Sequence, residues 1–171
     1  MLMNALYGKL HRALAASSTQ DVGASFPEYS KSGPQALGSR LRLHGTRHAL
    51  SGLMSSDWLT GMKDHTFVSE IYAVPSTVGA YCTVRRIQEK TNVERLRRRH
   101  AKRHSVSLEE ARIRIPDSVE KRTKLPFVML SSTSTGRKFP LFIEQVQAQS
   151  GVTPGTFNSY GLSVSASLPW F

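Results

Sequence analysis

The order of sequence patterns along this 171-residue chain predicts an α+β fold built from two halves. In residues 1–78 the helical and strand patterns follow a ferredoxin-like order in which the opening strand is missing. Residues 79–171 combine an arginine-rich helix with alternating residues that predict a β-hairpin. The segment 75–79 carries Pro and Gly and is the expected boundary. We therefore expect a ferredoxin-like domain over 1–78 and a second domain, which contains the arginine-rich helix, over 79–171.

The first half begins with a helix, because Leu2, Leu6, Leu10 and Leu14 recur four residues apart. This helix should end near Ser17–Ser18. Four further patterns predict, in chain order, a strand, a strand, a helix and a strand: 22–27, 41–44, 48–62 and 67–74. A ferredoxin-like half would have one more strand in front of the first helix.

The second half continues with an extended run over Tyr81–Ile87 that leads into a basic helix. Ser107 and Glu110 have the spacing of a capping box, which predicts another helix that Pro116 ends. The remaining pattern predicts a strand, a tight turn and a returning strand: 127–132, Thr135–Gly136 and 139–146.

The basic helix, over 91–104 with Thr91 or Asn92 as its N-cap, carries the densest positive charge of the chain. Helical spacing places four cations on one face, and Glu94 is the only acid among the fourteen residues. These cations are Arg98, Arg99, Lys102 and Arg103. Such a face favours contact with a nucleic acid, the alternatives being a solvated or a membrane-surface helix. A metal pair made by His100 and His104 is disfavoured, because the surrounding cations would repel a metal ion.

Composition points in the same direction. The net charge is +11 and the pI is about 10.3, which indicates a polyanionic partner. No stretch approaches the roughly 18 consecutive apolar residues of a membrane span, so we expect no membrane partner. The only cysteine, Cys82, cannot form an internal disulfide. This fits a protein of the reducing cytoplasm in which Cys82 is a small core residue.

Nine short motifs, spread from one end of the chain to the other, resemble the CRISPR repeat-processing endoribonucleases of the I-F subtype, the Csy-type crRNA-maturation enzymes. They are L-Y-G-K-L-H ending at His11, A-S-F-P ending at Pro27, R-L-R-L-H ending at His44, N-x-E-R-L-R-R-R from Asn92, E-E-A-R-I-R-I-P ending at Pro116, L-P-F-V ending at Val128, S-x-S-T-G from Ser132, Y-G-L-S from Tyr160 and P-W-F from Pro169. Members of that family carry about one further strand's worth of residues before the first helix.

The resemblance implies a reaction and three catalytic residues. Such enzymes cut precursor CRISPR RNA at the base of the repeat hairpin without a metal or cofactor, using the ribose 2′-OH and leaving a 2′,3′-cyclic phosphate. His11 falls on the catalytic histidine, Ser132 on the serine that positions the ribose hydroxyl, and Tyr160 on the tyrosine beside the histidine. Without the resemblance these residues would be a solvated histidine, a turn-capping serine and a core tyrosine.

The resemblance also implies RNA-binding residues. Arg86 and Gln88 match residues that recognise the lowest base pairs of the stem, and these side chains suit G and A edges respectively. Arg98, Arg99, Lys102 and Arg103 would enter the groove of a short hairpin, because the major groove of a long A-form duplex is too narrow. Phe139 matches an aromatic residue that stacks below the terminal base pair. The alternatives are an exposed strand edge for Arg86 and Gln88 and a buried strand residue for Phe139.

These observations lead to one main hypothesis and two alternatives. The main hypothesis is a cytoplasmic, metal-independent CRISPR repeat endoribonuclease that stays on the crRNA 3′ hairpin, together with other Cas subunits of a type I-F surveillance complex. The first alternative is a non-catalytic hairpin-binding subunit of a crRNA-guided DNA-targeting complex. This class includes complexes that are associated with a transposon. The second is a basic DNA-binding or ribosomal-type protein, which would bind duplex DNA as well as a hairpin.

Overall fold

The computed structural model of the protein describes residues 2–30, 36–88, 93–119, 123–148 and 151–171. Within these ranges it contains helices and antiparallel sheets, which confirms the predicted α+β class. The chain divides into two compact units, one formed by Met1–Ile87 with Leu125–Phe171 and the other by Gln88–Lys124. This division differs from the expected boundary after residue 78, because the strand that follows the boundary pairs within the first unit. No described helix is long and apolar enough to cross a membrane.

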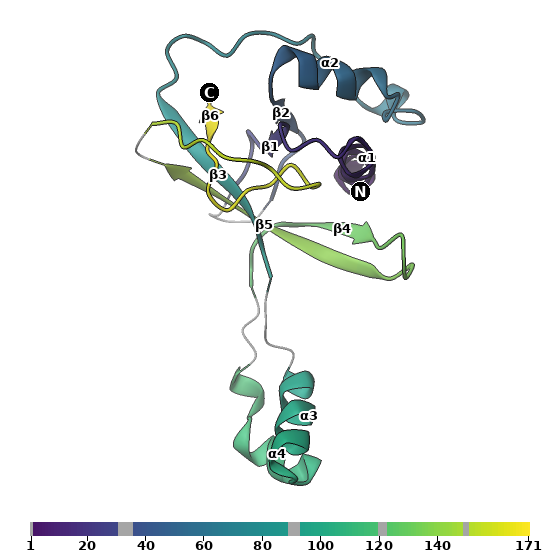
Figure 1. Cartoon of the computed structure of the whole chain (residues 1–171), viewed down its shortest axis with the longest axis vertical. Helices are drawn as coiled ribbons and strands as arrows, with labels where there is room; N and C mark the ends of the chain where they lie inside the picture. Colours follow the sequence, from purple (N-terminus) through teal and green to yellow (C-terminus); the bar gives the residue numbers. More distant parts are fainter. Residues whose placement is uncertain (1, 31–35, 89–92, 120–122, 149–150) are drawn as a thin grey trace. The chain divides into compact units, whose positions relative to one another are not determined.

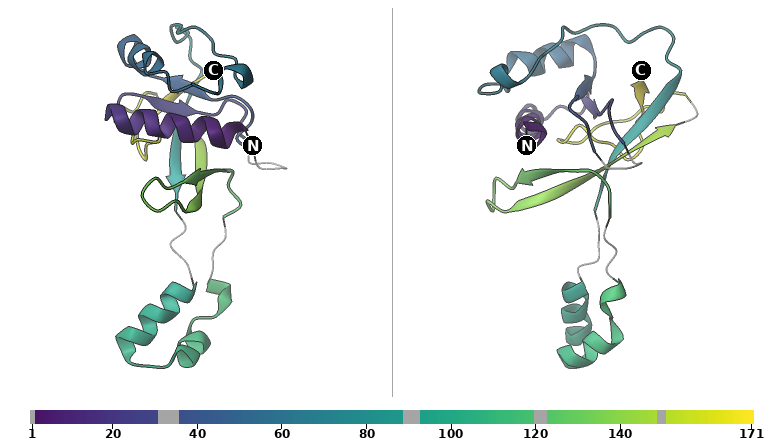
Figure 2. Two further views of the ribbon diagram at one scale, coloured as in Figure 1. Left: turned by 90° about the vertical axis from the view of Figure 1, so that its right-hand side faces the viewer. Right: turned by 180° about the vertical axis from the view of Figure 1, so that it is seen from behind.

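The first unit is built on helix α1 (Leu2–Ser17), which ends where the leucine spacing predicts. Its buried face consists of Tyr7, Leu10 and Leu14, whereas Leu2 is half exposed. The core-facing stripe is therefore rotated from the predicted row of leucines toward Tyr7. Helix α1 packs beside α2 and beside strand β4, and Figure 2 shows it side-on. The Asn4 amide oxygen accepts a hydrogen bond from Met129 N at 3.1 Å, which fixes the helix to that strand.

Strands β1 (Gly23–Ser25) and β2 (Arg42–His44) form a two-stranded antiparallel sheet at the two places predicted. A buried side chain joins this sheet to the larger one. Gln145 of β5 accepts a hydrogen bond from Phe26 N and donates one to Phe26 O, at 2.9 and 3.0 Å. The amide of Gln145 thus satisfies two backbone groups that would otherwise be buried without a partner.

The larger sheet is antiparallel and has the strand order β4-β5-β3-β6 (Figure 1). Its strands are β3 (Ala80–Ile87), β4 (Phe127–Ser131), β5 (Lys138–Ala148) and β6 (Leu168–Trp170). Strands β4 and β5 form the predicted hairpin, in which Gly136 adopts φ +66° at the turn. A positive φ strongly favours glycine, so the turn forms where its residues predict. The hairpin carries Ser132 and Phe139 beside the middle of α1.

Two predictions in the first half are corrected. Helix α2 (Arg47–Ser55) begins at its N-cap Thr46 but stops seven residues earlier than predicted. The reason is local, since the hydroxyls of Ser55 and Ser56 bond backward to Ser51 O and Leu53 O and compete with the helix. The short 3-10 helix Lys63–His65 follows. Leu59 and Met62 are nevertheless buried, so the apolar spacing identified core residues correctly.

The second correction concerns segment 67–74, which was predicted to be a strand and forms none. Its apolar side chains are exposed, Phe67 to 96%. An extended segment becomes a strand only when a neighbouring strand pairs with it. Here a hollow of about 440 Å³ lies between this segment and β2, and the segment pairs with no described strand. The structure shows the helix, the two strands and the second helix of the predicted order. The ferredoxin-like arrangement as a whole stays a prediction.

The second unit consists of α3 (Val93–His104), α4 (Leu108–Arg114) and the short 3-10 helix Asp117–Val119. The predicted N-cap residues Thr91 and Asn92 lie outside the described residues. The capping box of Ser107 and Glu110 is confirmed. Arg97, only 7% exposed, holds the unit together by donating hydrogen bonds of 2.9 Å to Glu94, Asp117 and Ile115 O. Glu94, the acidic residue in the first turn of α3, thus pairs with Arg97.

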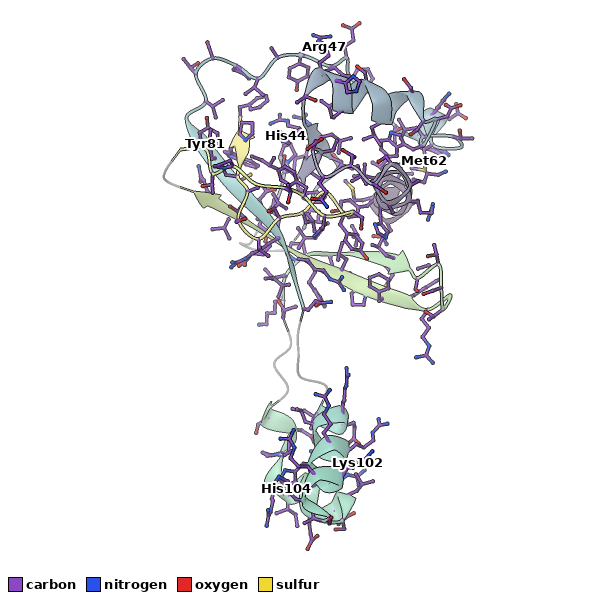
Figure 3. All side chains as sticks on the ribbon, viewed as in Figure 1. His44, Arg47, Met62, Tyr81, Lys102 and His104 are labelled. Carbon is purple, nitrogen blue, oxygen red and sulfur yellow. The ribbon has the colours of Figure 1, made fainter. Side chains whose placement is uncertain are left out.

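Cys82 and His44 are titratable groups buried in the core of the first unit. Burial raises the pKa of the Cys82 thiol to about 11, which confirms Cys82 as an apolar core residue. His44, labelled in Figure 3, is 8% exposed, and its Nε2 lies 2.8 Å from the hydroxyl of Ser25. Burial, and then the charge of Arg42, lower the pKa of His44 from 6.5 to about 4.

This lowered pKa predicts that acid destabilises the fold through His44. The unfolded chain binds a proton at residue 44 below pH 6.5, whereas the folded protein does so only below about pH 4. Stability is thus fully present above pH 6.5 and is lost as the pH falls toward 4, by about 3 kcal/mol. Urea unfolding at pH 7.5 and 4.5 measures the loss.

The control is His44→Gln, which keeps a hydrogen-bonding side chain but does not titrate. Its free energy of unfolding should change less over the same pH range, and the difference between the two proteins isolates His44 from the carboxylates. An identical pH dependence in both proteins would show that His44 does not carry the effect.

Candidate active site

A pocket of about 280 Å³ in the first unit brings together four of the predicted residues. His11, Ser132, Phe139 and Tyr160 all line it, although they come from α1, the hairpin and a loop near the C-terminus. The other lining residues are Gly8, Arg12, Leu130, Ser131 and Thr133. The lining contains an imidazole, a phenol, three further hydroxyls and a guanidinium. It contains no carboxylate, so the pocket suits an anionic ligand.

The imidazole of His11 is held by two contacts. Its Nδ1 lies 2.9 Å from the carbonyl oxygen of Ser159, and its ring stacks on Tyr160 with centroids 4.0 Å apart and planes at 10°. A carbonyl oxygen only accepts, so Nδ1 carries the hydrogen and donates it. In the neutral ring Nε2 then has the free lone pair. The arrangement leaves His11 able to take up a proton at Nε2.

Tyr160 is positioned through its own backbone. The hydroxyl of Tyr7, one turn before His11 on α1, donates a hydrogen bond of 2.7 Å to Tyr160 O. Burial raises the pKa of Tyr7, so its phenol stays protonated and remains a donor. Tyr7 and His11 lie four residues apart on one helix face and bond to consecutive carbonyls, Tyr160 O and Ser159 O. Helix α1 therefore fixes the loop at two adjacent points.

The loop has an internal frame as well. The side-chain oxygen of Asn158 accepts hydrogen bonds from Tyr160 N and Leu162 N, at 2.9 and 3.3 Å. Gly161 has φ +71°, and a Cβ there would lie 3.0 Å from Ala24 Cβ. Its carbonyl accepts a hydrogen bond of 2.8 Å from Ala24 N in β1. Glycine is required at this position, because a side chain would push the loop and its tyrosine away from β1.

Ser132 occupies the first position of the hairpin turn. Its hydroxyl lies 3.1 Å from that of Ser134 and accepts a hydrogen bond of 3.3 Å from Thr135 N. The turn-capping alternative for Ser132 is thus seen in the structure. It does not conflict with the predicted role, since a hydroxyl oxygen has a second lone pair and Ser132 also lines the pocket.

Phe139 and Arg86 lie beside the pocket on neighbouring strands. Phe139 lies on β5 opposite Leu130 and is half buried. Its ring is therefore neither fully exposed for stacking nor fully buried in the core. The guanidinium carbon of Arg86 lies 5.6 Å from the ring centre of Tyr160 and 5.9 Å from that of Phe139. Both distances are within the range of cation–π attraction. Arg86 is therefore placed next to the candidate catalytic residues.

The other predicted RNA contacts belong to the second unit. Gln88 is exposed just past the end of β3, and α3 exposes the four cations Arg98, Arg99, Lys102 and Arg103. Figure 3 labels Lys102 and His104 on this helix. His100 and His104 lie with ring centres 4.4 Å apart. Among the described residues, no group of three or more His, Cys, Asp or Glu side chains is arranged to hold a metal ion.

Sequence reasoning missed the residues that hold the site together. Tyr7 and the carbonyl of Ser159 act through hydrogen bonds between segments about 150 residues apart, whereas Asn158 acts through bonds within its own loop. Arg12 was also missed, although it follows His11 directly and lines the pocket. The only available signal was the four-residue spacing of Tyr7 and His11, which places both side chains on one helix face.

Comparison with known proteins identifies the family. The family model described as CRISPR-associated protein (Cas_Csy4) matches residues 1–171. The chain belongs to this family. It is 46% identical over 170 residues to the CRISPR-associated endonuclease Cas6/Csy4 of Pseudomonas aeruginosa (strain UCBPP-PA14), which covers 99% of the chain and 90% of the relative. It is 41% identical over 171 residues to the CRISPR-associated endonuclease Cas6/Csy4 of Escherichia coli (strain UTI89 / UPEC), which covers 100% and 90% respectively. The resemblance seen in the motifs is thereby confirmed.

The geometry of this Cas_Csy4 member predicts that Tyr7→Phe loosens the site. Removing the hydroxyl leaves a partly buried carbonyl without its donor, at a cost of about 1–2 kcal/mol in the free energy of unfolding. Tyr160 should then stack less closely on His11. Urea unfolding measures the first effect, and the ring-current shift of the His11 proton resonances measures the second.

Tyr29→Phe is the matched control, because the Tyr29 hydroxyl also bonds to a backbone carbonyl, Ile143 O at 3.4 Å, but Tyr29 does not line the pocket. It should leave the His11 resonances unchanged. Equal shifts in both variants would mean that the Tyr7 bond does not position Tyr160.

Proposed function

We propose that this protein cleaves CRISPR precursor RNA at the base of the repeat hairpin, by attack of a ribose 2′-OH on the adjacent phosphate and without a metal. The observation that carries the proposal is the stacked and tautomer-fixed His11, which shares a pocket with the hydroxyl of Ser132. The family assignment supports it, since both relatives named above are CRISPR-associated endonucleases.

Each catalytic group has a defined task in this reaction. Nε2 of His11 takes the proton of the 2′-OH as the 2′-oxygen bonds to phosphorus. The bond from phosphorus to the 5′-oxygen breaks, and the proton passes from His11 to that oxygen. Ser132 holds the ribose, and Tyr160 stacks on the imidazole and keeps it parallel to the phenol ring. The products are a 2′,3′-cyclic phosphate and a 5′-hydroxyl, so no water is consumed.

Recognition is divided between side chains with different tasks. Arg86, beside the pocket, would contact the edge of a guanine in the lowest base pairs, with Gln88 contacting the next pair. Phe139 would stack under the terminal base pair, which would place the scissile phosphate beside His11. The four exposed cations of α3 would bind the phosphates of the stem.

Retention of the product follows from this division. Apart from the broken bond, the contacts with the stem are the same before and after cleavage. We therefore propose that the protein stays on the 3′ hairpin of the crRNA in the cytoplasm, as a subunit of a type I-F surveillance complex with other Cas proteins.

His11→Ala should abolish cleavage and leave hairpin binding within a few fold, because the imidazole moves a proton and the stem contacts lie elsewhere. The assay uses a labelled repeat hairpin in EDTA, with the protein in excess, and scores the cut and its cyclic-phosphate end. Hairpin affinity is measured at the same salt concentration.

Three outcomes would contradict the proposal. Cutting by His11→Ala would exclude His11 as the base, and loss of wild-type activity in EDTA would indicate a metal enzyme. Tight hairpin binding by a wild-type protein that never cuts would favour the non-catalytic binding subunit.

The two classes of RNA contact should separate in binding experiments. Arg86→Ala should reduce discrimination against altered base pairs at the foot of the stem by about 1–3 kcal/mol. Arg103→Ala should weaken binding to all hairpins alike and reduce the slope of log affinity against log salt by about 1. Titrations of a cognate and a base-pair-swapped hairpin at several salt concentrations measure both. Equal loss for both hairpins in Arg86→Ala would assign Arg86 to phosphate binding.

A further inference from the structure

Among the described residues that line the pocket of His11, Arg12 is the only arginine or lysine. Arg12 is the residue after His11 on α1, and its side chain runs back along the helix. A Cβ placed on Gly8 would lie 3.7 Å from Arg12 Nη1 and 3.7 Å from Leu130 Cδ2. The guanidinium therefore lies over Gly8, between α1 and the end of β4, on the side where Ser131, Ser132 and Thr133 line the pocket.

In the part of the chain that the structure describes, no acidic side chain pairs with Arg12. Within the described part of the chain its exposed side chain forms no hydrogen bond and no ion pair. Other arginines do form them: Arg85 bonds to Glu144 at 2.7 Å, and Arg97 bonds to Glu94 and Asp117. A free guanidinium beside three hydroxyls and an imidazole, with no carboxylate in the lining, is a site for an external anion.

The proposed reaction places such an anion there. As the 2′-oxygen bonds to phosphorus and the bond to the 5′-oxygen breaks, negative charge accumulates on the two non-bridging oxygens. His11 moves the proton from the 2′-oxygen to the 5′-oxygen and does not neutralise this charge. A guanidinium presents two parallel N–H donors at the spacing of two phosphate oxygens. Donors of this kind lower the barrier when they are held where the charge develops.

We propose that Arg12 is a further catalytic residue, which binds the non-bridging oxygens of the scissile phosphate and stabilises the charge that develops on them. This inference rests on the proposed function. Helix α1 would then supply two catalytic groups from consecutive residues. His11 moves the proton, and Arg12 binds the phosphate oxygens.

Arg12→Ala should lower the single-turnover rate of hairpin cleavage at saturating protein by about 100-fold. Arg12→Lys should fall between this variant and the wild type, because lysine keeps the charge and loses the two-donor fork. The matched control is Arg47→Ala on α2, which removes an exposed arginine outside the pocket (Figure 3). Hairpin affinity should fall by no more than a few fold in Arg12→Ala and stay unchanged in Arg47→Ala, because Arg12 would contact one phosphate among many and Arg47 lies outside the pocket.

A phosphorothioate substrate separates phosphate contact from other roles. Replacing either non-bridging oxygen of the scissile phosphate by sulfur gives two diastereomers, and the wild-type protein should cut each at least about tenfold more slowly than the all-oxygen hairpin, because sulfur is a weak acceptor for the guanidinium donors. Arg12→Ala should cut the sulfur and oxygen substrates at more similar rates. An unchanged ratio of these rates in Arg12→Ala, or a cleavage rate equal to that of Arg47→Ala, would overturn the inference while leaving the proposed function intact. Failure of the wild-type protein to cut any hairpin would overturn both.

Discussion

The candidate site depends on two hydrogen bonds that α1 makes to the backbone of the loop at 158–161. Tyr7 donates to Tyr160 O and His11 donates to Ser159 O. Each bond alone would leave the loop free to pivot, whereas two bonds one helical turn apart fix both its position and its direction. The stack of His11 on Tyr160 follows from this attachment, because the imidazole that donates the bond is held parallel to the next side chain. The tautomer of His11 is set by the same contact.

The two compact units separate two physical tasks. The first unit supplies a pocket whose groups are oriented by buried hydrogen bonds, which suits chemistry that requires fixed geometry. The second unit presents exposed cations on a helix stabilised by the buried Arg97, which suits binding to phosphates. Arg86 belongs to the first unit and lies within cation–π range of two pocket residues, so under the proposed function it would couple base recognition to the geometry of the pocket. Under the proposed function, the exposed cations of the second unit would supply the affinity for the stem.

Much of this was predictable from local patterns. The first helix, the capping box of Ser107 and Glu110, the Thr135–Gly136 turn and the strand Ala80–Ile87 each follow from residues within a few positions of one another. Helix α2 was predicted too long, because apolar spacing continued past hydroxyls that compete for the backbone. Segment 67–74 was predicted as a strand from its side chains, yet pairing depends on a neighbour that its own residues cannot specify. Of the site, His11, Ser132 and Tyr160 were found through a family resemblance, while Tyr7 and Asn158 required the fold.

The position of the site on α1 has a consequence for how stability and activity are linked. Tyr7 belongs at once to the hydrophobic core and to the attachment of the loop, since its ring is fully buried beside Phe26 and its hydroxyl reaches Tyr160. The loop is tied to β1 through Gly161 and to the large sheet through the bond from Ser163 N to Val84 O. Any motion that separates His11 from Tyr160 must therefore disturb buried groups of the core. The geometry of the site is thus maintained by the same free energy that keeps the first unit folded, and the site is expected to stay assembled without RNA.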